Sequence, residues 1–180
     1  SGPRLTPRRD FRFVVLIALF FFLYVGAEAS FGGWIATYAK ATGVGGSATA
    51  AYLTSVFWGA LTAGRLLSIP LAARFSPRQV LLTDLLVCFG SVLALFIWPG
   101  SVVATWVGTF GAGLGMASIF PTTLSLAERN TTITGAVTSW FFVGGSLGGM
   151  SVPWLIGQLF ESRGPGVTVF AMVTAVALAM

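Results

Sequence analysis

The chain has 180 residues, of which 56% are hydrophobic and 8% charged, with one cysteine and no histidine. An average soluble domain carries roughly a quarter charged residues, and disordered chains are rich in charge, so both classes are excluded. The apolar stretch between Asp84 and Glu128 carries no charge; in a water-soluble globule a helix of that kind would need a polar face. The sequence therefore predicts an all-α, polytopic membrane protein.

Six apolar segments, bounded by turn residues and charges, are predicted to cross the membrane. In chain order they cover Phe13–Tyr38, Ala50–Ala73, Val80–Trp98, Val102–Leu126, Thr134–Phe160 and Val167 onward. None shows the ten-residue alternation of apolar and polar positions that marks a membrane strand. The last segment is shorter than the roughly 20 residues that one crossing needs. We therefore expect the chain to be truncated within that segment, and residues 1–12 to form a cytoplasmic linker.

Positive charge is distributed unequally between the two ends of the predicted bundle. One end has the N-terminus and the connections after the second and fourth segments, and it carries Arg4, Arg8, Arg9, Arg12, Arg74, Arg78 and Arg129, with Arg65 close by. The opposite end carries Lys40 and Arg163. This bias predicts a cytoplasmic N-terminus. It also accounts for the net charge of +5 without a nucleic-acid partner, and none is expected.

Glu28 lies near the middle of the first segment, where a carboxylate costs about 2.5–3.5 kcal/mol on insertion scales. Tyr24 lies one helical turn earlier, on the same face. We expect this pair to line a polar cavity for a solute or a coupling proton; the alternative is a structural hydrogen bond between helices. Three tryptophans lie deep in later segments and are expected either to stack on a ring-shaped ligand or to pack, namely Trp58, Trp106 and Trp140.

Charged residues also gather where the second segment leads into the third. Here the sequence predicts a latch that joins adjacent helix ends in one conformational state, because a buried Asp84 needs cationic partners. Its members are Gly64, Arg65, Arg74, Arg78 and Asp84. The alternative is that Arg65 extends to the membrane surface and only sets orientation.

Glycine and proline are concentrated in the fourth and fifth segments. Small residues let helices approach closely, and proline frees a backbone carbonyl. We expect kinks or sliding contacts at Gly113, Pro121, Gly149 and Pro153.

Residues for the common catalytic constellations are missing from the sequence. Without histidine, and with one cysteine and five carboxylates, it offers no catalytic triad, carboxylate pair or metal cluster, and it has no phosphate-binding loop. We expect neither an enzyme nor a metal or organic cofactor.

Several motifs resemble the major facilitator superfamily. Gly64-Arg65 leading to Arg74-Phe-Ser-Pro-Arg78 resembles the cytoplasmic signature loop of its C-terminal half, although Ala73 replaces the usual acidic residue, which leaves Asp84 to serve alone. The stretch 24–34 is similar to the seventh helix of the fucose-permease-like branch, which includes sodium-dependent glucose transporter-like proteins. The stretches 113–122 and 144–157 resemble the tenth and eleventh helices of that branch.

The resemblance implies that residues 13–180 are helices seven to twelve of a twelve-helix transporter, folded as two inverted three-helix repeats. It implies secondary active transport of a small polar solute by alternating access, with a sugar as the expected solute and H⁺ or Na⁺ as the coupling ion. Its partners would be the solute, the lipid bilayer and an N-terminal six-helix half.

In this family the first, second, fourth and fifth helices of each half line the cavity. The residues of these helices that we expect to face the solute are Tyr24, Glu28, Trp58, Thr62, Trp106, Phe110, Ser139 and Trp140. Two alternatives remain: a drug or organic-ion exporter on the same scaffold, and a non-transporting membrane subunit that binds a partner protein.

Overall fold

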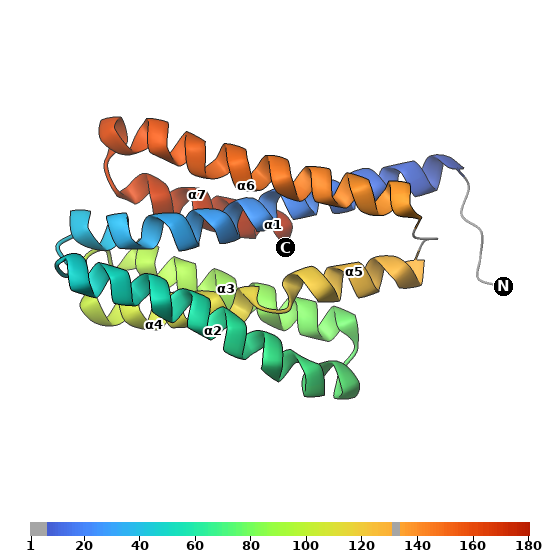
Figure 1. Ribbon diagram of the computed structural model, residues 1–180, viewed down its shortest axis with the longest axis horizontal. Coiled ribbons are helices and arrows are strands. Elements are labelled where there is room, and N and C mark those ends of the chain that lie inside the picture. Colours follow the sequence, from blue (N-terminus) through green and yellow to red (C-terminus); the bar gives the residue numbers. More distant parts are fainter. Residues whose placement is uncertain (1–6, 131–133) are drawn as a thin grey trace.

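The computed structural model describes residues 7–130 and 134–180, and within these residues it contains helices and no strands. The helices are α1 (Pro7–Ala41), α2 (Ser47–Arg74), α3 (Pro77–Ile97), α4 (Val102–Met116), α5 (Ile119–Asn130), α6 (Gly135–Arg163) and α7 (Gly166–Ala179). They form an elongated bundle in which the long helices run along the same direction (Figure 1). The predicted all-α class is confirmed. Helix α1 begins at Pro7, so residues 7–12 of the predicted linker are helical, and residues 1–6 lie outside the described part.

Helix starts follow local capping signals. At the start of α3, the side chain of Ser76 accepts a hydrogen bond from the Gln79 backbone and the Gln79 side chain accepts one from the Ser76 backbone, with Pro77 as the first helical residue. The side chains of Ser101 and Thr134 accept a backbone hydrogen bond at the starts of α4 and α6. These caps satisfy backbone donors that a helix end leaves free.

The predicted fourth segment is interrupted at Ala117 and Ser118, which separate α4 from α5. The cause is local, because Pro121 has no N–H to donate to the carbonyl of Ala117 four residues earlier. Gly113, expected to share this kink, instead provides a close approach to α2. A Cβ atom at Gly113 would lie 2.5 Å from the carbonyl oxygen of Phe57. Helix α6, by contrast, is continuous through both of its expected kink residues, Gly149 and Pro153.

Four spans in the described residues are long and apolar enough to cross a membrane, where six were predicted. They are Phe11–Ala41, Ser47–Arg74, Pro77–Ile97 and Val102–Arg129, the last of which joins α4 and α5. Helix α6 has 29 residues, but its many glycine and serine residues dilute its apolar character. Helix α7 is apolar and has 14 residues.

The ends of the helices alternate between the two ends of the bundle, as predicted. The start of α1, the α2–α3 connection, the end of α5 and the start of α6 lie at one end (Figure 1). The α1–α2, α3–α4 and α6–α7 connections lie at the other. The arginine-rich connections therefore share one end of the molecule.

Helices α1, α2 and α3 form one three-helix set, and the other consists of α4 with α5, α6 and α7. Packing between the two sets is reciprocal. Helix α1 packs against α6 and α7, and α4 packs against α2 and α3, so the first helix of each set rests on the second and third helices of the other. This exchange fits two nested three-helix repeats. Glycine permits the closest crossings: Gly144 and Gly148 of α6 face the backbone of Ala18 and Phe22 in α1. Aromatic rings also pack between the two sets, and the ring centroids of Phe21 and Phe120 are 4.7 Å apart.

Candidate functional site

An ion pair joins α1 and α2 in the middle of the bundle. The guanidinium of Arg65 lies 3.9 Å from the carboxylate of Glu28. The Glu28 side chain is 16% exposed and the Arg65 side chain 54% exposed, so the pair is accessible from the Arg65 side. We refer to this pair, with Trp58 and Thr62 of α2, as the α1–α2 site. Arg65 therefore pairs with Glu28 of α1. We had expected it to act with the charges near the α2–α3 connection instead. A carboxylate at this depth needs such a partner.

The α1–α2 site includes an aromatic ring. Trp58, Thr62 and Arg65 share one face of α2, since they follow one another at helical spacing. The Trp58 indole lies against Gly32 of α1, where a Cβ atom would come 2.5 Å from the ring, and 44% of the Trp58 side chain is exposed. A flat apolar ring beside an ion pair suits a solute that combines hydroxyl groups with an apolar face.

Tyr24 connects Glu28 to the break between α4 and α5. Its side chain is buried, and its hydroxyl is within hydrogen-bond distance of the Glu28 carboxylate. The same hydroxyl donates to the carbonyl oxygen of Met116, the last residue of α4, at 2.8 Å. The predicted pairing of Tyr24 with Glu28 thus extends to a helix end on the opposite side of the bundle core.

Asp84 takes a different partner from the one expected. Its carboxylate accepts a hydrogen bond from the hydroxyl of Ser118, inside the α4–α5 break. In the described residues the ion pair of Arg65 is with Glu28, so the expected Arg65–Asp84 contact is not formed in this conformation. Gly64 lies at the same break, because a Cβ atom there would approach the Cβ of Ala117 at 2.5 Å. A latch role for Arg74 and Arg78 stays a prediction.

The other expected solute-binding residues lie on α4 and α6. Trp106 is half-buried and packs against the core, and Phe110 is 50% exposed on α4, which packs against α2. Ser139 and Trp140 are exposed on α6, which contacts neither α2 nor α4 among the described residues. The expected set therefore divides between the α1–α2 site, α4 and α6. Their role in solute binding stays a prediction.

Two groups at the helix break were not identified from the sequence: the Met116 carbonyl and the Ser118 hydroxyl. The proline at position 121 signals that carbonyls in the preceding turn lose their helical donors. It does not indicate which side chains of other helices approach them. No three His, Cys, Asp or Glu side chains in the described ranges gather closely enough to hold a metal ion.

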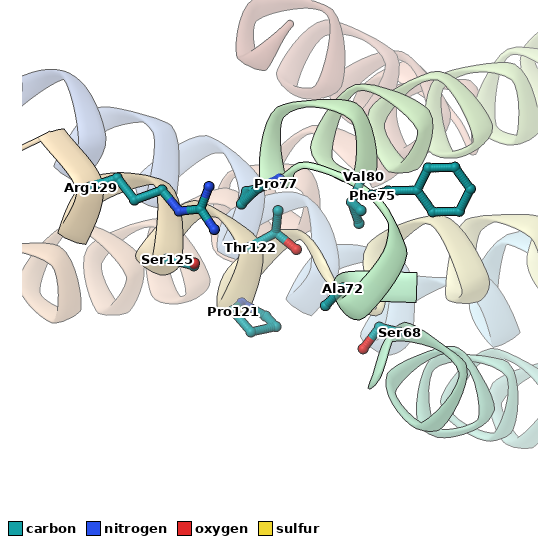
Figure 2. A pocket seen from close by; sticks show the side chains of 9 residues that line it. All are labelled: Ser68, Ala72, Phe75, Pro77, Val80, Pro121, Thr122, Ser125 and Arg129. Atoms are coloured by element: carbon teal, nitrogen blue, oxygen red, sulfur yellow. The ribbon is translucent and has the colours of Figure 1, made fainter. Parts of the chain in front are cut away.

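A cavity of about 140 Å³ opens between α2, α5 and the start of α3. Figure 2 shows the Arg129 side chain extending from α5 toward Pro77, with the hydroxyl groups of Ser68, Thr122 and Ser125 around the space. A guanidinium beside hydroxyls can hold an anionic group. This cavity occupies the region expected to hold the latch, and none of the latch residues lines it.

The sequence of the chain matches a known protein family. The family model of the Major Facilitator Superfamily matches residues 2–153. The chain belongs to the Major Facilitator Superfamily. This result confirms the predicted resemblance and agrees with the multi-pass, membrane-spanning character of the helices.

Individual relatives within the superfamily include sugar transporters. The chain is 40% identical over 148 residues to sodium-dependent glucose transporter 1 of Xenopus laevis, covering 81% of this chain and 30% of the relative. It is 35% identical over 144 residues to sodium-dependent glucose transporter 1 of Homo sapiens, covering 80% and 28%. It is also 36% identical over 159 residues to major facilitator superfamily domain-containing protein 4A of Danio rerio, covering 88% and 30%. The chain thus spans about 30% of the length of these relatives.

Proposed function

We propose that the chain forms the C-terminal half of a secondary transporter that moves a sugar or a similar small polar solute by alternating access. The observation that carries the proposal is the α1–α2 site, where the Glu28–Arg65 ion pair and the partly exposed ring of Trp58 occur together. Charged hydrogen-bonding groups near an aromatic face are features that suit a sugar. The glucose-transporter names of the relatives support the same solute class.

We further propose that Glu28 binds solute hydroxyl groups or takes part in ion coupling, with Na⁺ or H⁺ as the driving ion. The names of two relatives, both sodium-dependent glucose transporters, favour Na⁺. An N-terminal six-helix half would complete the cavity, since family members rock two such halves around a central site. The arginine-rich end would face the cytoplasm, and the protein would act as a transporter rather than an enzyme.

Uptake measurements on the complete protein in liposomes test this proposal. We expect saturable uptake of one labelled sugar from a panel, driven by an inward Na⁺ or H⁺ gradient. In Glu28→Gln we expect the Michaelis constant to rise about tenfold, because one charge-assisted hydrogen bond to the solute is lost, and the gradient dependence to weaken. Glu161→Gln changes a carboxylate at the exposed end of α6 and should leave uptake unchanged.

Each outcome separates the candidate functions. Normal uptake in Glu28→Gln would keep transport but reduce Glu28 to a structural hydrogen bond. Absence of uptake for every sugar under both gradients would overturn the sugar proposal. Efflux of organic ions would then favour the exporter, and absence of any flux would favour a subunit that binds a partner protein.

A further inference from the structure

The Tyr24 hydroxyl has two acceptors and one proton. The Met116 carbonyl, 2.8 Å away, can only accept a hydrogen bond. An ionised Glu28 carboxylate, the second group within reach, can also only accept. A single phenol proton cannot satisfy both, so the hydrogen-bond pattern depends on the protonation state of Glu28.

Each protonation state produces a different arrangement. When Glu28 carries a proton, it donates that proton to the Tyr24 oxygen, and Tyr24 donates its own proton to the Met116 carbonyl. When Glu28 is ionised, it pairs with Arg65 and attracts the Tyr24 proton, and the Met116 carbonyl loses its donor. This carbonyl ends α4 at the break, so losing the donor removes one of the bonds that hold α4 and α5 in position.

We propose that Tyr24 is a positioning residue that transmits the protonation state of Glu28 to the α4–α5 break, which is fastened when Glu28 is protonated and released when it is ionised. A second bond, from Ser118 to Asp84, fastens the other side of the same break. The inference goes beyond the proposed function, because it concerns a helix junction rather than the solute. Its test needs no solute.

Few other titratable groups lie near Glu28, so few can influence its hydrogen bond with Tyr24. Arg65 faces it from α2, Asp84 reaches the break from α3 through Ser118, and Cys88 of α3 is fully buried nearby. Helix α7 contains no ionisable residue, and α6 carries its charges in its last turn. Asp84 is therefore the other carboxylate that acts on the break, through Ser118.

Backbone hydrogen exchange of the complete protein, without solute, tests the switch. We expect the amides of residues 117–120 and 122 to exchange about five- to tenfold more slowly in Glu28→Gln, whose neutral amide mimics the protonated acid, than in the wild-type protein, where Glu28 pairs with Arg65; this is the effect of one hydrogen bond. Tyr24→Phe has no hydroxyl to donate to the Met116 carbonyl and should exchange fast. The variant carrying both changes should exchange as fast as Tyr24→Phe alone, because the effect of Glu28→Gln requires the Tyr24 hydroxyl.

Two further variants separate this mechanism from a general loss of packing. Tyr38→Phe is the matched control, since Tyr38 lies on the same helix and donates to the Leu95 carbonyl of α3 at 3.2 Å; added to Glu28→Gln, it should leave the slow exchange of residues 117–120 and 122 unchanged. Ser118→Ala should raise exchange overall and keep the difference between wild type and Glu28→Gln. If Glu28→Gln exchanges as fast as the wild-type protein, or if its slow exchange persists without the Tyr24 hydroxyl, the proposal is overturned. If Tyr24→Phe fails to fold, the comparison of Glu28→Gln with wild type still decides it.

Discussion

Replacing Gly148 by alanine should lower the free energy of unfolding by about 2–3 kcal/mol, the cost of inserting a group into a contact that is already closed. Gly148 lies where α6 crosses α1, and a Cβ atom there would come 2.7 Å from the carbonyl carbon and 2.8 Å from the Cα of Phe22. These are backbone atoms of a packed helix, so they cannot move aside as a side chain can. The two helices must separate, which weakens the main contact between the two three-helix sets.

The neighbouring residue provides the control. At Gly149 the nearest atom to an added Cβ is a methyl carbon of Val25 at 3.4 Å, which is an ordinary contact. Alanine also favours a helix over glycine by about 1 kcal/mol, so Gly149→Ala should be neutral or slightly stabilising. The measurement is the melting temperature of the purified protein in detergent, followed by tryptophan fluorescence. Equal melting temperatures for the two variants would contradict the close crossing.

The sequence was sufficient to predict the membrane class and the alternation of the helix ends. Charge is so scarce that its positions mark the connections, and the apolar runs are long enough to be counted against the bilayer thickness. The number of membrane-spanning helices was harder to establish at α6. Residues such as Gly144 and Gly148, which allow close packing, also lower the hydropathy of this helix. Composition alone cannot distinguish a weakly apolar membrane helix from one that is shielded by its neighbours.

The contacts within the site were harder to predict, because helical periodicity gives the face of a residue but not the helix that faces it. Tyr24 and Glu28 share a face by spacing alone, and the structure agrees. The partner of Arg65 depends on where α2 crosses α1, which no local pattern encodes. Pro121 signalled a break in the fourth segment, but the bonds that fasten it come from Tyr24 and Asp84 on two other helices.

Replacing Arg65 by methionine should reduce sugar uptake at neutral pH about thirtyfold, corresponding to about 2 kcal/mol, midway between exposed and buried ion pairs. The intermediate value is appropriate because Glu28 is mostly buried and Arg65 is about half exposed. Without the guanidinium, the ionised Glu28 loses its counter-ion. Arg65→Lys, which keeps the positive charge, should retain most of the uptake.

A double-mutant cycle distinguishes this role from the latch in which Arg65 acts with Asp84. If Arg65 mainly neutralises Glu28, the variant carrying both Arg65→Met and Glu28→Gln should transport no worse than Glu28→Gln alone, because the charge that needed a partner is already gone. If Arg65 acts through Asp84 instead, the two losses should add, and Asp84→Asn should reproduce the defect of Arg65→Met. Additive losses would therefore rule out the ion pair as the functional contact of Arg65, while leaving Glu28 free to bind the solute by itself.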